Sequence, residues 1–174
     1  MIVLVGESGS GKSSIEKNLV DNHGFNKTTS YTTRPPRTGE VDGVDYHFVS
    51  VSEFRRLKEQ GFFAEIGEYN NWYYGTAKKD CTNDKVAVIT PHGLRQLRKV
   101  KDINIFAIYI NVPRRDRLIK ILQRGDNIEE SYRRNLSDLG QFDGIQDEVD
   151  AIINNPNYEK DIHTMTMEVL NLIS

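Results

Sequence analysis

The sequence predicts an α/β protein with a parallel sheet at its centre. Residues 85–90, 104–112 and 150–154 are short apolar runs, which are typical of strands buried on both faces. Segments with helical spacing of apolar residues separate these runs, as they do in parallel sheets. The 174 residues are sufficient for a single domain with a sizeable core.

The first part of the chain is expected to form a strand, a helix and a second short strand. Residues 1–5 are apolar and precede a glycine-rich stretch. A helix starts at about Lys12, continues over 14–21 and ends at Gly24, a residue suited to helix ends. Residues 26–30 are then expected to be extended.

The middle of the chain changes in composition. Residues 31–45 are rich in Thr, Arg, Pro and Gly and must form a loop, because two adjacent prolines forbid a continuous helix. A strand over 46–51 and a helix over 53–60 follow, with Ser52 as the expected N-cap. An extended segment, a turn and a strand come next, at 62–69, 70–71 and 72–76.

Helices fill the rest of the chain between the buried strands. The sequence 91–93 predicts a turn, and a helix should follow to about residue 100. Further helices are expected over 114–123, 129–140 and 158–173. In the first of these, Leu118, Ile121 and Leu122 are expected to face inward.

A phosphate-binding motif directly follows the first strand. Residues 6–13, here called the glycine loop, fit G-x-x-x-x-G-K-[ST] at every fixed position. Glycines allow backbone N–H groups to curl toward phosphate oxygens, and the next helix adds its positive end. Lys12 supplies a mobile charge for the β- and γ-phosphates, and the Ser13 hydroxyl is placed to ligate Mg²⁺. A chance turn is disfavoured because strand, loop and helix occur in the required order, so the motif predicts binding of a nucleoside triphosphate.

Composition excludes several other classes of protein. The net charge of −2 and the pI of about 6.1 argue against a dedicated nucleic-acid binder. One cysteine, Cys81, excludes an internal disulfide framework. No apolar run approaches membrane-spanning length, and no signal peptide precedes the first strand. We therefore expect a cytoplasmic protein with no membrane partner.

Two arginines stand three residues apart in the proline-containing loop. Arg34 and Arg37 flank Pro35 and Pro36, so their guanidinium groups sit on a stiffened backbone. Such a pair suits a second phosphate group. An ordinary solvated loop is the competing interpretation, and on these residues alone it is favoured by about two to one.

One carboxylate lies in an apolar setting. Glu65 is expected mid-strand between Phe63, Ala64 and Ile66, where a charged group needs a partner. The guanine edge offers N1–H and N2–H₂ side by side, and a carboxylate can accept both.

The loop and the following strand carry a family resemblance. Residues 30–48, Ser-Tyr-Thr-Thr-Arg-Pro-Pro-Arg-Thr-Gly-Glu-Val-Asp-Gly-Val-Asp-Tyr-His-Phe, resemble the monophosphate-binding signature of guanylate kinases. The resemblance continues through 63–65 and 73–76 and is weaker over 124–131. It implies a P-loop three-layer fold with a parallel core sheet, a small mixed β/α monophosphate-binding subdomain and a helical lid. The implied parts of this single domain are a core (1–30, 81–123 and 141–174), a monophosphate-binding region (31–80) and a lid (about 124–140).

The resemblance also implies an activity and the residues for it. The γ-phosphate of ATP would move to GMP or dGMP, with Mg²⁺ held by Ser13, in a monomer or homodimer. The implied catalytic cations are Lys12, Arg34, Arg37, Arg124 and Arg134. The implied ATP-binding residues are Gly6, Glu7, Ser8, Gly9, Ser10, Gly11, Lys12, Ser13, Ser14 and Asn154. The implied acceptor-binding residues are Ser30, Glu65 and Thr76 for guanine, Arg34, Arg37, Tyr46 and Tyr74 for the monophosphate, and Glu40, Gly75 and Thr90.

Two departures from the family pattern stand out. The family usually has aspartates on the strand that ends near Thr90, where this chain has Val88 and Thr90. Mg²⁺ would then depend more on Ser13, the phosphates and water, and activity or acceptor preference would change. The lid helix usually has an arginine where this chain has Asn135, and Arg134 lies about 100° away around the helix. Either the alignment slips by one residue or Arg134 acts from a different angle.

Two alternatives to a guanylate kinase stay open. One is a kinase for another nucleoside or sugar phosphate, against which Ser30, Glu65 and Thr76 argue because they match a guanine reader. The other is a catalytically weak binding module of this fold. Such modules typically have a damaged glycine loop, whereas this loop is intact.

Overall fold

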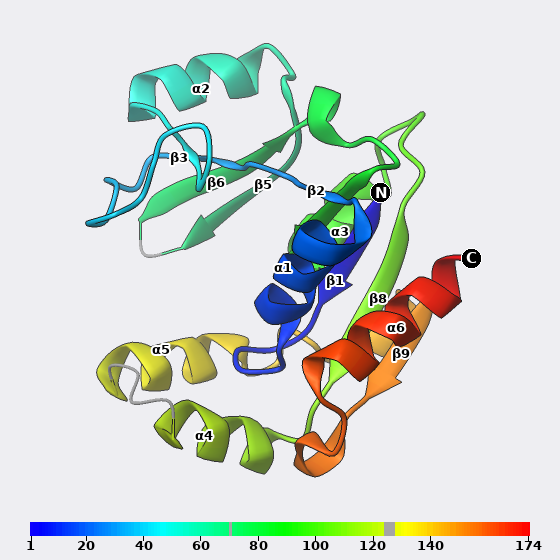
Figure 1. The fold of residues 1–174 in the computed structure, drawn as a ribbon. Coiled ribbons are helices and arrows are strands. Elements are labelled where there is room, and N and C mark those ends of the chain that lie inside the picture. The colour runs from blue at the N-terminus through cyan, green and yellow to red at the C-terminus, as the bar shows by residue number, and fades with distance from the viewer. Residues whose placement is uncertain (70, 124–127) are drawn as a thin grey trace.

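A parallel sheet runs through the centre of the protein in the computed structural model, which describes residues 1–69, 71–123 and 128–174 (Figure 1). Its strand order is β2-β7-β1-β8-β9, and all neighbouring pairs are parallel. The five strands are β1 (Ile2–Val5), β2 (Asn26–Lys27), β7 (Lys85–Val88), β8 (Phe106–Asn111) and β9 (Ala151–Asn154). The predicted parallel α/β fold is therefore confirmed.

Helices cover both faces of this sheet, as Figure 1 shows. On one face, α1 (Lys12–His23) and α6 (Ile162–Ile173) pack on alternate strand residues such as Leu4 and Val86. On the other face, α3 (Pro91–Leu97) packs on the intervening residues, which include Val5. Because side chains alternate along a strand, the continuous apolar runs are explained by burial on both sides.

A second, smaller sheet lies beside the first (Figure 1). Its order is β4-β3-β6-β5, with both parallel and antiparallel neighbours. The elements are β3 (Tyr31–Thr32), β4 (His47–Phe48), α2 (Val51–Glu59), β5 (Phe63–Tyr69) and β6 (Trp72–Ala77). Phe54 of α2 stacks on Phe63 with ring centroids 4.6 Å apart, and this contact gives the sheet a core of its own.

One glutamine joins the small sheet to the main body. Gln96 of α3 accepts a hydrogen bond from the Ile66 backbone N–H at 3.0 Å and donates one to the Ile66 carbonyl at 2.7 Å. The side-chain amide thus pairs with the edge strand β5 as a neighbouring strand would.

The remaining elements are short. Two helices, α4 (Arg114–Gln123) and α5 (Ile128–Asp138), lie together at the end of the molecule that is away from the small sheet (Figure 1). The 3₁₀ turns are η1 (Lys78–Asp80), η2 (Ile145–Asp147) and η3 (Pro156–Tyr158). In α4, Ile121 is buried as expected, but Leu122 is 63% exposed, so its predicted inward position is wrong.

Local differences from the predicted elements follow from capping. The N-cap of α2 is Ser50, whose hydroxyl accepts the Glu53 N–H at 3.1 Å, and not Ser52. The turn predicted at 91–93 is the first turn of α3. Proline suits the first helical position, because the N–H that it lacks would have no partner within the helix. The final helix begins at Ile162, after Asp161 as its cap.

Two predicted boundaries near the start of the chain also differ by a few residues. The extended segment predicted over 26–30 is shorter, because β2 ends at Lys27, and the loop predicted over 31–45 begins with the strand β3 at Tyr31.

In the parts of the chain that the structure describes, no helix has the length and apolar character needed to cross a membrane.

Leu19 should be a main contributor to stability, because its side chain is fully buried between α1 and the sheet. Replacing it with alanine should lower the free energy of unfolding by about 3 kcal/mol, measured by urea denaturation. Leu122→Ala is the matched control, since this exposed leucine should cost no more than about 0.5 kcal/mol. Equal losses of unfolding free energy in the two variants would contradict the burial of Leu19 between α1 and the sheet.

Candidate active site

The glycine loop has the curled backbone that its motif predicts. Gly11 is the N-cap of α1 in the left-handed conformation, with φ 98°. A Cβ on Gly6, whose φ is 157°, would lie 2.7 Å from the Ile110 carbonyl oxygen. Both positions therefore require glycine. Ser13 and Ser14 follow on the first turn of α1 and are exposed, while Ser10 is buried.

Lys12 folds back over the loop. Its ammonium donates hydrogen bonds to the Glu7 carbonyl at 2.8 Å and to the Ser10 hydroxyl at 3.3 Å. Burial lowers the pKa of Lys12 to about 8, although the nearby charges of Asp138 and Glu7 act in the opposite direction. A bound polyphosphate would place further negative charge beside this ammonium and raise the pKa again.

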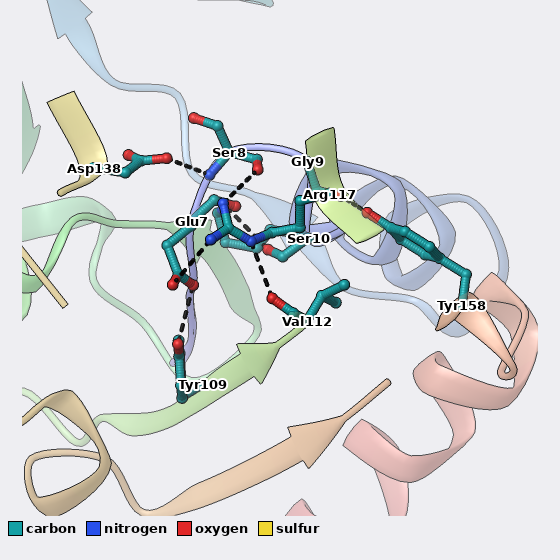
Figure 2. Close-up of polar contacts among 10 residues, drawn as sticks. Glu7, Ser8, Gly9, Ser10, Tyr109, Val112, Arg117, Asp138 and Tyr158 are labelled. Atoms are coloured by element: carbon teal, nitrogen blue, oxygen red, sulfur yellow. Dashed lines mark hydrogen bonds and ion pairs between the residues drawn. The ribbon is translucent and has the colours of Figure 1, made fainter. Parts of the chain in front are cut away.

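A buried arginine holds the loop from one side, as Figure 2 shows. Arg117 of α4 is 4% exposed and donates from Nε to the Val112 carbonyl at 3.0 Å and from Nη1 to the Ser8 carbonyl at 3.2 Å. Its Nη2 lies 3.4 Å from the Glu7 carboxylate, which also accepts the Tyr109 hydroxyl at 3.0 Å. Burial raises the pKa of Tyr109, so this hydroxyl stays a donor.

Two further side chains hold the loop backbone (Figure 2). The Ser8 N–H donates to the Asp138 carboxylate at 2.7 Å, and the Tyr158 hydroxyl donates to the Gly9 carbonyl at 2.6 Å. The loop brace, meaning Arg117, Tyr109, Asp138 and Tyr158, was not predicted from sequence. These residues lie more than 100 positions from the loop and belong to no local motif, so no signal near the loop marked them.

The predicted phosphate clamp comes together at the small sheet. Arg34 is 5% exposed, and its guanidinium lies 5.3 Å from the centre of the Tyr46 ring. The Tyr46 and Tyr74 rings are 6.0 Å apart, and hydrogen bonding to Glu40 and Tyr74 raises the pKa of Arg34. Arg37 is exposed. Arg34 is thus an ordered cation, contrary to the solvated-loop interpretation.

Glu40 organises the clamp. Its carboxylate accepts a hydrogen bond from Arg34 Nη2 at 2.8 Å and another from the Arg37 backbone N–H at 2.7 Å. Both contacts lower the pKa of Glu40, with the Arg34 hydrogen bond the larger cause. The carboxylate therefore fixes the two arginine positions relative to each other.

A buried carboxylate and a hydroxyl form the candidate base reader. Thr76 donates to Glu65 at 2.7 Å, and neither side chain is more than 8% exposed. Burial raises the pKa of Glu65, while the Thr76 hydrogen bonds lower it. Gly93, which was not predicted, leaves room for this carboxylate, because a Cβ there would lie 2.9 Å from Glu65 Oε2.

Neighbouring predicted residues occupy the same region. Tyr31 pairs with Gly75 in the small sheet, so Ser30 precedes β3 at the level of Thr76. A Cβ on Gly75 would lie 2.8 Å from the Phe63 ring, which explains the glycine. The Thr90 hydroxyl accepts the Gly93 N–H at 3.1 Å and thereby caps α3.

Two predicted residues lie apart from these groups, and a third falls outside the described residues. Asn154 is exposed at the end of β9, where its side chain accepts a hydrogen bond from Asn111 at 2.7 Å. Arg134 is exposed on α5, whereas its neighbour Asn135 is 3% exposed and lines a cavity of about 480 Å³ beside Glu7. Arg124 lies outside the described residues.

The residues of this site fit a magnesium ion that would be held by Ser13 and by the phosphate groups of a bound nucleotide. Across 1–69, 71–123 and 128–174 there is no group of three or more His, Cys, Asp or Glu side chains that could hold a metal. Mg²⁺ commonly keeps several waters and is bound through few protein groups plus substrate phosphates. The exposed Ser13 hydroxyl at the start of α1 meets that need.

A glycine loop at the carboxyl end of β1 in a parallel sheet defines a P-loop nucleotide-binding protein. A protein-family model described as guanylate kinase matches residues 1–171, and the chain belongs to this family.

Individual relatives agree with this assignment. The chain is 38% identical over 168 residues to a guanylate kinase of Nitratidesulfovibrio vulgaris, covering 92% of this chain and 81% of that protein. It is 36% identical over 167 residues to one of Nostoc sp., covering 91% and 83%. A crystal structure of guanylate kinase from Anaplasma phagocytophilum matches with a TM-score of 0.69 and 23% identity, covering 99% and 83%, and supports the fold.

Binding of MgATP should be accompanied by proton uptake at pH 8. Lys12 is about half protonated there in the free protein, since its pKa is about 8, and the bound phosphates should protonate it fully. About half a proton per ATP is expected, measured by titration calorimetry in two buffers of different ionisation enthalpy. ATP affinity should also fall as the pH rises above 8, by up to about tenfold per pH unit.

Lys12→Arg is the control for this proton uptake, because arginine is already protonated and takes up no proton. Equal apparent binding enthalpies for the unaltered protein in both buffers would contradict the buried state of Lys12.

Proposed function

We propose that this protein transfers the γ-phosphate of ATP to GMP or dGMP, giving ADP and the nucleoside diphosphate. The carrying observation is that the small sheet and the loop between β3 and β4 bring together the buried Arg34, held by Glu40, and the buried Glu65–Thr76 pair. The glycine loop supplies the donor site on the main sheet. The relatives are named guanylate kinases, which supports the same reaction.

The donor site consists of backbone and one lysine. We assign the triphosphate to the N–H groups of residues 6–14 and to Lys12, with the adenine side near Asn154. Ser13 would hold Mg²⁺, which when bound neutralises charge on the β- and γ-phosphates. The loop brace keeps the backbone curved before ATP arrives, so little reorganisation accompanies binding.

The acceptor site has a charged end and a reading end. Arg34 and Arg37 would hold the monophosphate, together with the hydroxyls of Tyr46 and Tyr74. Glu40 would position these arginines and not touch the phosphate itself, because its carboxylate already engages Arg34.

At the reading end, the Glu65 carboxylate would accept hydrogen bonds from guanine N1–H and N2–H₂. Thr76 orients that carboxylate, and Ser30, Gly75 and Thr90 border the same space. The two N–H groups of guanine would replace the hydrogen bonds to water that the buried Glu65 carboxylate has lost, whereas adenine offers no such pair of donors.

The transfer step needs positioning and positive charge more than covalent chemistry. Two anionic substrates repel each other, and cations aimed at the transferring phosphate offset this repulsion. We assign that role to Lys12, to the clamp and to the lid arginines Arg124 and Arg134. The proposed division is a core (1–30, 81–123 and 141–174), an acceptor-binding region (31–80) and a lid (about 124–140).

One observation favours a second function, a nucleotide-binding module with weak turnover. The strand β7 ends in Val88, and Thr90 caps α3, so neither position supplies a carboxylate. The intact glycine loop and the ordered clamp argue for the enzyme.

The decisive assay measures ADP release from MgATP with GMP, dGMP, AMP, CMP, UMP and dTMP. Turnover restricted to GMP and dGMP is expected. Turnover with another monophosphate would refute the base assignment, and ATP binding without any turnover would favour the binding module.

Arg37 should be needed for transfer and not for folding. Because Arg37 is exposed, Arg37→Ala should leave the melting temperature unchanged. It should lower kcat/KM for GMP by about 100-fold or more, through the loss of a charge-assisted phosphate contact. Arg56→Ala on α2 is the control, since this exposed arginine contacts Glu53 and Gln60 of its own helix region and should leave turnover intact. Wild-type kinetics in Arg37→Ala would remove it from the clamp.

Glu65 should set the preference for guanine. In Glu65→Gln one acceptor oxygen becomes a donor that faces guanine N–H groups, so the GMP-over-AMP ratio of kcat/KM should fall by about 10-fold to 100-fold. The exposed Glu68 of the same strand provides the control Glu68→Gln, which should keep the ratio. Undiminished discrimination in Glu65→Gln would place the base elsewhere.

A further inference from the structure

The end of strand β7 faces helix α1. Leu4 of β1 pairs with Val88, and Val86 and Val88 pack in the same core cluster as Ile15 of α1. The intervening Ala87 belongs to the cluster on the opposite face. A side chain at position 88 therefore points toward α1, beside the start of the helix that carries Ser13.

A carboxylate approaches the same place from the helix. Glu16 lies four residues after Lys12 and three after Ser13, which puts it on their side of α1. Its side chain is half-buried. Burial raises the pKa of Glu16, while the charge of Lys27 and a hydrogen bond from the Val88 backbone lower it. Its neighbour Ile15 packs in the same core cluster as Val88, so the half-buried Glu16 lies beside the end of β7, where the strand itself has valine.

We infer that Glu16 supplies the carboxylate for the hydrated Mg²⁺ of bound ATP, in place of an acidic residue on β7. This inference rests on the proposed function, because it needs ATP in the glycine loop. Mg²⁺ keeps several of its waters, and those waters donate hydrogen bonds to carboxylates just outside the coordination sphere. Glu16 is therefore a positioning residue that acts through water.

The competing explanation is a structural ion pair between Glu16 and Lys27. Lys27 is exposed on the edge strand β2, and exposed pairs contribute little to stability. Such a pair also gives no reason for the carboxylate to lie near Ser13. A test must therefore separate an effect on the metal from an effect on folding.

The experiment compares ATP affinity with and without Mg²⁺ by titration calorimetry, in the absence of an acceptor. In Glu16→Gln the ratio of MgATP affinity to metal-free ATP affinity should fall about 10-fold, the effect typical of losing an outer-sphere partner. Metal-free ATP should bind at least as tightly as before, since a negative charge has been removed. Asp21→Asn is the matched control on the same helix, because Asp21 is exposed and pairs with Lys17, and it should keep the ratio.

A second variant tests whether a carboxylate from β7 can replace the one from Glu16. Adding Val88→Asp to Glu16→Gln returns a carboxylate to the same space from the strand, and it should restore the ratio. Should the double variant fail to fold, Glu16→Asp serves instead and should retain most of the ratio, because it keeps the charge.

Three results would overturn the inference. One is an unchanged ratio in Glu16→Gln. Another is an equal fall in Lys27→Gln, which would assign Glu16 to the ion pair. The third is an absence of ATP binding by the unaltered protein, which would refute the proposed function as well. Normal MgATP binding by the unaltered protein together with an unchanged ratio in Glu16→Gln would refute this inference alone.

Discussion

The buried guanidinium of Arg117 is the interaction on which the glycine loop depends. A loop of backbone N–H groups aimed inward has few internal contacts to keep it curved. Arg117 holds it through the Ser8 carbonyl and the Glu7 carboxylate, and it is itself fixed by the Val112 carbonyl. Because Val112 directly follows β8 and Arg117 lies on α4, folding of the main sheet also shapes the glycine loop.

The same arrangement couples the glycine loop to helix α5. Asp138 is the last residue of α5, and its carboxylate binds the Ser8 N–H while its charge acts on Lys12. A polyphosphate in the loop would repel this carboxylate and attract the ammonium. The position of α5 and the occupancy of the loop are therefore energetically linked through one side chain.

Carboxylates serve different purposes in this protein. Glu40 fixes the arginines of the clamp, and Glu65 lies buried with Thr76 at the reading end. Each carboxylate accepts a hydrogen bond from a nearby donor, since an uncompensated buried charge would destabilise the fold. The proposed acceptor site is thus largely ordered before a substrate arrives, which would lower the entropic cost of binding.

The sequence by itself determined the parallel α/β fold and the curled glycine loop, because these follow from local patterns, namely apolar runs and a glycine motif. The burial of Arg34 did not follow from its neighbouring prolines, since a solvated loop can have the same composition. Element boundaries at Ser50 and Pro91 differed because capping depends on hydrogen bonds that several nearby residues could make. Only the tertiary structure decided that Arg117 holds the loop and that the half-buried Glu16 lies beside the end of β7. Such contacts join segments far apart in the chain, and no local spacing encodes them.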